Sequence, residues 1–377
     1  MQHKTSAWPL AGAYALLLVY ASLYPFSGWR NQEIPPWDFL FAGWPKYWTK
    51  FDLAANVVGY IPLGFLLALS FMRRGNVRYF ASHANLAAIA VAVLAGTALS
   101  FLMEAIQSFL PSRVASNVDF GLNAAGTLLG AVVAAGLELG GAIDHWSRFR
   151  ERWFIPEARG ALVLLALWPF ALLFPAAVPL GLGQVLERLE DGLAAWLEET
   201  PFLEWLPVRE VELQPLVPAA ELLCVALGAF IPCLLGYTIL RSPGRRAVFA
   251  VFAVALGASV TALSAALSWG PQHAWAWVSV PVRVGLLFGL ILAMMMLAVP
   301  RRGCAAMLLL VLVVHLAVLN QAPASAYFTV TLQEWEQGRF IRFHGLAQWL
   351  GWLWPYAVLV YVLLRVSRRE SPPTIPA

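Results

Sequence analysis

Ten long, nearly charge-free stretches constrain this chain more than any other feature. Each is close to the ~20 residues that a helix needs to cross the hydrocarbon core of a bilayer. Of the 377 residues, 60% are hydrophobic and only 12% are charged, about half the charged fraction of a soluble domain. The sequence therefore predicts an all-α fold, a polytopic transmembrane bundle of about ten helices. The expected spans are residues 8–25, 53–72, 85–108, 118–138, 160–179, 216–240, 247–268, 281–299, 303–321 and 346–365.

The positions of Lys and Arg predict the orientation of these spans. With both termini inside, most of the Lys and Arg fall in inner segments, as the positive-inside rule requires, and the outer loop 183–214 is strongly acidic. This arrangement explains the basic net charge of +4 without a nucleic-acid partner. We expect an inner-membrane location with N-in, C-in topology, and the acidic loop could dock a periplasmic or membrane protein. The first stretch could also be a signal peptide, but its length favours an uncleaved helix.

Four regions are expected along the chain. The ends of the stretches and the loop charges predict a four-helix membrane module, a basic cytoplasmic linker, a second four-helix membrane module that contains the acidic periplasmic loop 183–214, and a C-terminal helix pair with a periplasmic interfacial segment at 334–345. Their respective bounds are 1–140, 141–159, 160–300 and 301–377. In the interfacial segment, Arg339, Arg342 and His344 could anchor an amphipathic helix or bind lipid phosphates.

Polar residues gather at the outer ends of three consecutive spans. Ionisable groups inside hydrocarbon cost roughly 2.5 to 3.5 kcal/mol each, so they are seldom there without a role. Spacings of three and four residues put each acid and its amide on one helix face. We predict that these residues form a ligand-binding cluster closed by a short turn, and they are Asp52, Asn56, Glu104, Gln107, Arg113, Asp119 and Asn123.

Three carboxylates at one depth need a compensating charge. Arg113 could supply it, as could a proton on Glu104 or a divalent cation bound by Asp52, Glu104 and Asp119. Each arrangement would suit a polar head group of a membrane lipid or lipid-linked glycan. The alternative is that interhelical hydrogen bonds between these side chains hold the bundle together.

Small residues next to this cluster predict close helix packing. Gly126 and Gly130 form a G-x-x-x-G pattern that permits close approach. We expect them to seat this helix against the one that contains Pro62 and Gly64, where proline can kink the helix.

The order and spacing of these motifs resemble the VanZ-like family. The motifs are L-Y-P-F at 23–26, D-L-A-A-N-V-V-G-Y-I-P-L-G-F at 52–65, E-A-I-Q-S-F-L-P-S-R at 104–113 and D-F-G-L-N-A-A-G-T-L-L-G at 119–130. The resemblance covers about residues 1–140. It implies a four-helix module of the bacterial cell envelope, in a family whose founding member is linked to teicoplanin (glycopeptide) resistance. That role does not carry over to the longer chain here.

The second module contains short motifs similar to those of the first, as in a degenerate repeat. L-F-P at 173–175 and A-F-I-P at 229–232 correspond to L-Y-P and G-Y-I-P, and Gly285 and Gly289 correspond to Gly126 and Gly130. The acids are not repeated, because Glu104 falls on Ser264 and Asp119 on Val278. These patterns suggest a 4+4 repeat followed by two C-terminal helices, with shared membrane-helix composition as the alternative explanation.

The motifs of common catalytic and metal sites are missing from the sequence. No P-loop, nucleophile-elbow or paired zinc pattern occurs, and Cys224, Cys233 and Cys304 lie in apolar runs without metal-ligand spacing. No cofactor is evident beyond the divalent cation considered above. We therefore expect a binding or accessory role in recognising a lipid or glycolipid head group rather than an enzyme. The alternatives are an enzyme acting on lipid-linked phosphate or glycan and a proton-coupled transporter.

Overall fold

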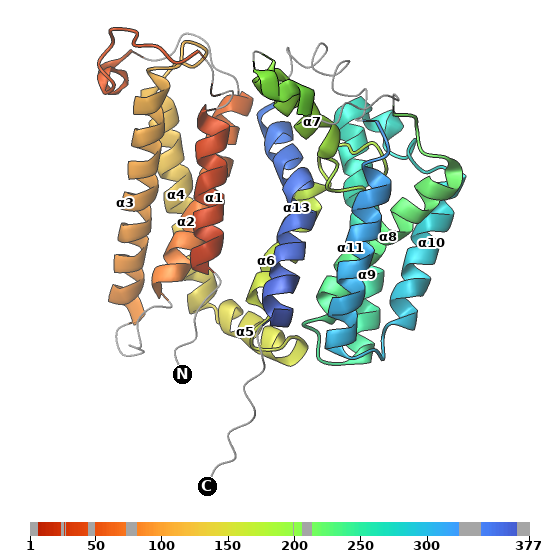
Figure 1. Ribbon diagram of the computed structural model, residues 1–377. Helices are drawn as coiled ribbons and strands as arrows, with labels where there is room; N and C mark the ends of the chain where they lie inside the picture. Colours follow the sequence, from red (N-terminus) through yellow and green to blue (C-terminus); the bar gives the residue numbers. More distant parts are fainter. Residues whose placement is uncertain are drawn as a thin grey trace. The chain divides into compact units, whose positions relative to one another are not determined.

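The chain folds into helices throughout the part that the structure describes. This computed structural model describes residues 7–23, 26, 28–43, 50–72, 81–198, 200–205, 213–323 and 341–367 (Figure 1). Within these residues the only β-type pairing is a single bridge between Phe154 and Leu240. The all-α fold class predicted from the sequence is confirmed.

All ten expected spans are helical, and the chain is a polytopic helical membrane protein. Three of the ten form shorter apolar helices, α1 (Ala7–Leu23), α6 (Arg159–Ala171) and α10 (Val280–Met295). The described residues contain seven helices that are long and apolar enough to cross a membrane: Leu53–Met72, Asn85–Gln107, Asn117–Leu139, Pro218–Tyr237, Pro243–Trp269, Arg301–Leu319 and Ala347–Ser367.

Prolines explain why two of these stretches end early as helices. The stretch expected at 160–179 contains Pro175 and Pro179, and the chain leaves the helix after Ala171. The stretch expected at 281–299 precedes Pro300, and α10 ends at Met295. A proline has no N–H to bond the carbonyl four residues earlier, here that of Ala171 or Met296, and its ring clashes with that carbonyl, which a count of uncharged residues does not register.

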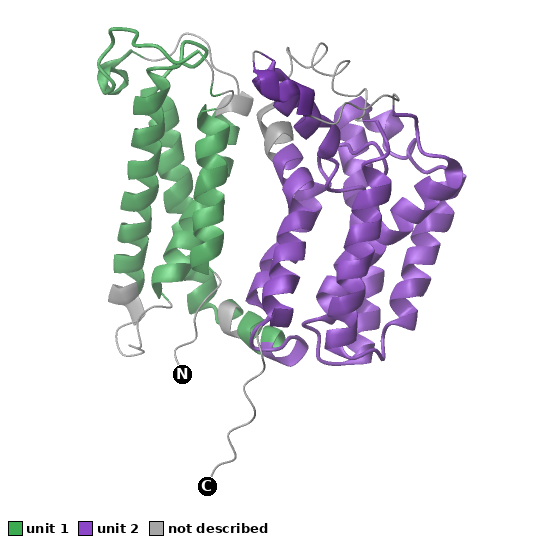
Figure 2. Cartoon of the chain, in the orientation of Figure 1, with its two compact units in different colours: residues 1–150 green, residues 151–377 purple. Residues whose placement is uncertain are grey.

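Two compact units divide the chain at residue 150 (Figure 2). Unit 1 contains α1 and the helices η1 (Asp38–Phe41), α2 (Lys50–Met72), α3 (Ala81–Gln107) and α4 (Asn117–Leu139). The basic segment 141–159 forms a helix, α5 (Ala142–Trp153), over most of its length. Unit 2 contains α6, α7 (Leu186–Leu197), η2 (Pro201–Trp205), α8 (Pro218–Tyr237), α9 (Pro243–Trp269), η3 (Pro271–His273), α10, α11 (Arg301–Leu319) and α13 (Ile341–Ser367).

Unit 1 is organised around the contact between α2 and α4, which lie side by side (Figure 1). Three glycines face backbone carbonyls of the opposite helix: Gly64 faces that of Thr127, Gly126 that of Val57 and Gly130 that of Ile61. A Cβ atom at any of the three would overlap the facing carbonyl oxygen. The two backbones are therefore in direct contact, as small residues permit in membrane helices.

Helix α1 packs on the proline-containing part of α2. Pro62 lies inside α2 and has no N–H to donate, and its ring disturbs the carbonyls of the preceding turn. The hydroxyl of Tyr14 on α1 donates to the carbonyl oxygen of Gly59 at 2.8 Å. This hydrogen bond pairs a backbone acceptor in the turn that the proline weakens.

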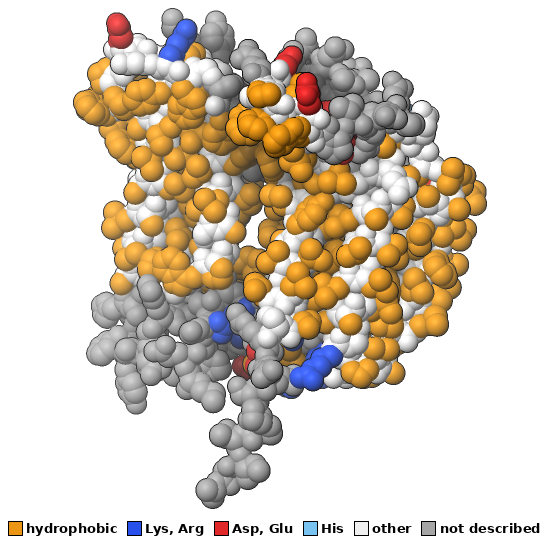
Figure 3. Space-filling model, in the orientation of Figure 1, with side chains coloured by type: hydrophobic (Ala, Val, Ile, Leu, Met, Phe, Trp, Pro, Cys, Tyr) orange, Lys and Arg blue, Asp and Glu red, His pale blue; other side chains and the backbone are white. Residues whose placement is uncertain are grey.

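In unit 2 the central element is α8. Every residue of α8 from Cys224 to Tyr237 is buried, while α9, α10, α11 and α6 pack around it. Gly285 and Gly289 of α10 lie against the carbonyls of Leu222 and Ala226, the same kind of contact that joins α4 to α2. The outer faces of both units are apolar, and Figure 3 shows hydrophobic side chains over most of the visible surface. That distribution suits a lipid environment.

The structure describes the acidic segment within 183–214 more fully than the interfacial segment expected at 334–345. The acidic segment forms α7, whose Leu186, Leu189, Leu193 and Trp196 are all exposed, as in an amphipathic helix without a protein partner on its apolar side. Arg339 and the side chains of Arg342 and His344 lie outside the described residues. The backbone from Ile341 is the start of α13.

The α2–α4 contact makes a testable prediction about stability. Gly130→Ala places a methyl group against the carbonyl of Ile61, so we expect a loss of about 1–3 kcal/mol, the usual cost of overpacking. The matched control is Gly136→Ala on the same helix, where a Cβ meets nothing within 4 Å. Thermal unfolding of both variants in the same detergent measures the difference. Equal melting temperatures for the two variants would contradict the proposed contact.

Candidate functional site

Three helices of unit 1 bring polar side chains together in successive layers. On each helix the relevant residues are four apart, which places them on one face, one turn after another. We call these layers tiers and number them from the N-terminal end of α4. The first tier is Asn56, Glu104 and Asp119; the second is Tyr60, Ser100 and Asn123; the third is Gly64, Gly96 and Thr127; and the fourth is Ala68, Ala92 and Ala131.

The first tier contains two acids at the start of α4. Asn56 Nδ2 donates to Asp119 Oδ1 at 2.7 Å. Glu104, which is only 4% exposed, accepts a hydrogen bond from the backbone N–H of Ser116 at 2.9 Å. Ser116 is also the N-cap of α4, and its Oγ accepts from the Asp119 N–H. The N-terminal end of a helix carries partial positive charge, so α4 favours both carboxylates here.

The second tier holds two buried polar atoms without a hydrogen bond. Asn123 Nδ2 donates to Ser100 Oγ at 3.0 Å, but Asn123 Oδ1 has no partner within the described part of the chain. The Tyr60 hydroxyl likewise makes no hydrogen bond of normal geometry within the described part of the chain, although the Ser100 side chain lies close enough to interact with it. Tyr60 and Asn123 are 4% and 5% exposed. An unpaired buried polar group costs about 1–3 kcal/mol, so this tier is short of a partner.

The third and fourth tiers close the polar layers toward the middle of the helices. The hydroxyl of Thr127 donates to the carbonyl of Asn123 at 2.9 Å and is thereby used within α4. Gly64 and Gly96 both lie against Thr127, leaving no space between the helices. Below them the fourth tier is a fully buried alanine cluster. The polar tiers thus lie at the end of the bundle where α4 begins.

The loop that contains η1 and a cluster of aromatic residues cover one side of the polar tiers at the end where α4 begins. Asn117 Nδ2 donates to the carbonyl of Ala42, which follows η1, at 2.6 Å. The ring of Phe39 on η1 packs against Phe101 and Phe120, with centroids 5.8 Å and 6.1 Å away. These two residues directly follow Ser100 and Asp119 in the sequence, so the aromatic cluster borders the first two tiers.

Residues 8–138 match the family model VanZ/LLP1. This stretch is a VanZ-like segment within a longer chain. It contains α1 to α4 and all four tiers, and it confirms the resemblance seen in the sequence. No curated protein and no solved structure matches the chain.

The VanZ-like segment places the predicted site residues in two groups. Asn56, Glu104, Asp119 and Asn123 lie in the first two tiers. Gln107 and Arg113 instead reach the end of α1, where Gln107 Nε2 donates to Ser22 O at 3.0 Å and Arg113 donates to Ala21 O at 3.4 Å. These two bonds attach the turn between α3 and α4 to α1. The side chain of Asp52 lies outside the described residues.

Three residues of the VanZ-like segment that contribute to this site were absent from the sequence prediction. Tyr60 follows Asn56 by four residues, and Ser100 precedes Glu104 by four, so extending each helix face by one turn would have found both. Ser116 could have been recognised as an N-cap, since serine commonly caps a helix whose third residue is acidic.

The described residues contain no group of three or more His, Cys, Asp or Glu side chains that could hold a metal ion. The side chain of Asp52 is not among these described residues. Glu104 and Asp119 interact electrostatically in the VanZ-like segment, and their remaining oxygens are of the hard type that divalent cations prefer.

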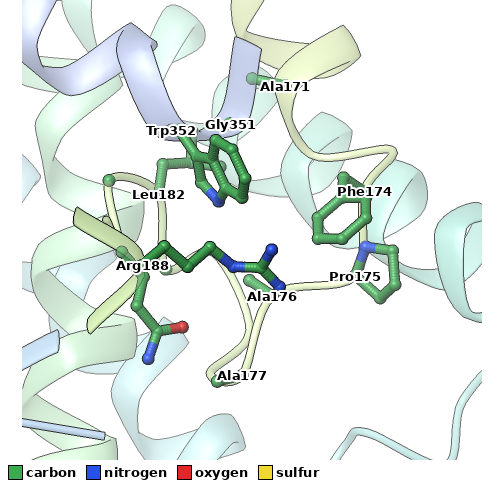
Figure 4. Close-up of a pocket in the computed structure, with 12 residues that line it drawn as sticks. Ala171, Phe174, Pro175, Ala176, Ala177, Leu182, Arg188, Gly351 and Trp352 are labelled. Atoms are coloured by element: carbon green, nitrogen blue, oxygen red, sulfur yellow. The ribbon is translucent and has the colours of Figure 1, made fainter. Parts of the chain in front are cut away.

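Outside the VanZ-like segment, unit 2 has a pocket between the end of α6, the start of α7 and α13 (Figure 4). The Arg188 guanidinium carbon lies 4.9 Å from the centroid of the Trp352 ring, and the side chain extends toward Pro175. Burial lowers the pKa of Arg188, and the neighbouring Glu187 and Asp191 partly offset this. With two acids beside its one cation, the pocket does not have the charge of an anion site.

The pairing inside the second tier can be tested by a single substitution. Ser100→Ala leaves Asn123 Nδ2 without its acceptor, so we expect a loss of about 1–3 kcal/mol in the free energy of unfolding. Ser259→Ala on α9 is the control, because its exposed hydroxyl bonds only to its own helix at Ala255 O. Chemical unfolding in mixed micelles compares the two. If Ser100→Ala is as stable as the control, the two side chains are not coupled.

Proposed function

We propose that the VanZ-like segment binds the polar head group of an envelope lipid or glycolipid at the end of its polar tiers where α4 begins. The head group would be one that carries hydroxyls, such as a sugar or a glycerol. The charge distribution of the loops supports a periplasm-facing site in a bacterial inner membrane. The role is one of recognition, in which the rest of the chain acts as a scaffold or partner.

The observation that carries this proposal is the pair of unpartnered atoms in the second tier. Asn123 Oδ1 can only accept a hydrogen bond, whereas the Tyr60 hydroxyl can both donate and accept. A single ligand hydroxyl placed between them would donate to the amide oxygen and accept from the phenol. A bound water could make the same bonds. Only a lipid, however, would add its own mass to the gently purified protein.

The first tier adds hydrogen-bond acceptors at the same end of the bundle. Glu104 offers one oxygen beyond the Ser116 N–H, and Asp119 is held in place by Asn56. Paired carboxylate oxygens accept hydrogen bonds from neighbouring sugar hydroxyls, or they bind an amine or a divalent cation attached to the head group. The first and second tiers together therefore favour a polyol or aminated head group over a free phosphate.

Exposed apolar side chains near the tiers favour a lipid as the molecule that carries this head group. Val58, Phe101 and Leu102 are exposed on α2 and α3 at the same level as the tiers. A ligand whose polar part enters the tiers could leave its acyl chain along these side chains. A soluble sugar would gain nothing from this apolar surface.

Tyr60→Phe separates ligand binding from stability. Because the hydroxyl makes no hydrogen bond of normal geometry to the described residues, removing it leaves the free energy of unfolding nearly unchanged. Losing one hydrogen bond to the ligand, about 1 kcal/mol, lowers the retained lipid roughly fivefold. Native mass spectrometry of gently purified protein, with lipid and metal analysis of the same samples, measures the occupancy.

Tyr14→Phe is the matched control, because it removes the same atom from the same unit but breaks the bond to Gly59 O. It should lower stability and keep the lipid, the reverse of Tyr60→Phe. Glu104→Gln should also reduce lipid occupancy while the protein still inserts. Wild-type occupancy in both Tyr60→Phe and Glu104→Gln would leave the polar tiers as helix-packing groups and remove the proposal.

A further inference from the structure

Four arginines gather where the buried helix α8 ends. The last carbonyls of a helix lack intrahelical donors and carry partial negative charge, so cations stabilise them. Three arginines from different helices supply the donors here. Arg246 donates to Tyr237 O at 3.1 Å, Arg365 to Thr238 O at 3.2 Å and Arg301 to Leu240 O at 3.4 Å. Arg241, which follows this segment, donates to Phe154 O at 2.8 Å.

The positive charge of this cluster exceeds the negative charge around it. Arg301 interacts electrostatically with Arg241, Arg246 and Arg365, and with one acid, Glu157. Arg246 is buried and hydrogen-bonded entirely to uncharged acceptors. Among the described residues, four like charges near one carboxylate repel one another, although solvent weakens the repulsion at the two exposed arginines. A bound anion would relieve this repulsion.

Two of the four arginines retain donors for such an anion. Arg241 and Arg301 are exposed, and each uses its Nε to bind a backbone carbonyl. Within the described residues, the terminal NH1 and NH2 groups of both have no hydrogen-bond partner. Each guanidinium is thus oriented by the protein through one nitrogen and presents a fork of two donors, the geometry that recognises phosphate oxygens.

The protein surface beside the arginines is apolar. On α9, Val248, Val251 and Phe252 are exposed within a few turns of the cluster, and on α13 Leu363 and Leu364 are exposed just before Arg365. On the face drawn in Figure 3, basic side chains at one end of unit 2 adjoin the hydrophobic side chains of its helices. A ligand at this position therefore has a charged group at the arginines and a hydrocarbon part along the helices.

We propose that Arg241 and Arg301 bind the phosphate of an anionic phospholipid, while Arg246 and Arg365 hold the end of α8 in place. Basic pockets between transmembrane helices are suited to anionic lipid head groups. The bound lipid neutralises the cluster and links α8 to α9, α11 and α13 through their shared ligand. This site lies wholly in unit 2 and is independent of the head-group site proposed for the VanZ-like segment.

The experiment titrates the full-length protein with phosphatidylglycerol, phosphatidylcholine or inorganic phosphate and detects binding by native mass spectrometry. We expect phosphatidylglycerol to bind most tightly. The double variant Arg241→Gln/Arg301→Gln should lower that affinity at least about tenfold, the effect of losing one charge-assisted hydrogen bond. Arg302→Gln and Arg283→Gln are the controls; each removes one positive charge from an exposed arginine outside the cluster and should leave the affinity within about twofold.

Three outcomes would overturn the proposal: unchanged affinity in the double variant, equal binding of phosphatidylcholine, or inorganic phosphate binding as tightly as the lipid. The last would make this a soluble-anion site. Since the arginines also support α8, the double variant could fail to fold. A photoreactive phosphatidylglycerol with its probe near the head group is therefore used on the wild type. Labelling of residues 239–248 and 297–305 supports the site, and labelling confined to other segments refutes it.

Discussion

The direct backbone contact between α2 and α4 is the constraint on which unit 1 depends. Gly64, Gly126 and Gly130 remove the side chains that would hold the two helices apart. Because polar residues alternate with these glycines at helical spacing, the same contact brings Asn56 within hydrogen-bonding distance of Asp119. The alternation of glycines and polar residues on α2 and α4 therefore determines both the helix packing and the arrangement of the polar tiers. A change that separates α2 from α4 would also separate the polar side chains.

The four tiers form a gradient from charge to hydrocarbon along the bundle. Carboxylates sit where the N-terminus of α4 and the Ser116 N–H favour them, amides and hydroxyls follow, and glycine, threonine and alanine complete the sequence. From one tier to the next toward the middle of the helices, the side chains thus need fewer hydrogen-bond partners. The exception is the second tier, where Tyr60 and Asn123 keep unpaired atoms behind a paired first layer. In the binding mode that we propose, a group that pairs them enters past Glu104 and Asp119, and the two acids would then help to select it.

The sequence was sufficient for the helices and for the end of the bundle at which the acids lie. Nearly charge-free stretches of about 20 residues indicate helices that can span a membrane. An acid and an amide one turn apart lie on the same side of such a helix. It was not sufficient for the partners of Gln107 and Arg113, because these depend on where α1 ends in space. Tyr60 and Ser100 were missed for another reason. Neither stands out by charge within an apolar run, and only their spacing of four residues from Asn56 and Glu104 distinguishes them in the sequence from packing residues.

In both units, glycines allow two helices to pack with their backbones in contact, but the polar groups of the two units differ. Glycine pairs seat α4 on α2 and α10 on α8, but relative to Pro62 and Pro232 the contact is shifted: Gly126 meets Val57, and Gly285 meets Leu222. An aligned repeat would keep that register, so the similarity in sequence does not extend to equivalent positions of every side chain. Ser264, at the position corresponding to Glu104, donates to the carbonyl of Leu173 and is used within the fold. Unit 2 thus has no counterpart of the acid–amide tiers among its described residues, and the arginines at the end of α8 are its most closely grouped charges in that part of the chain.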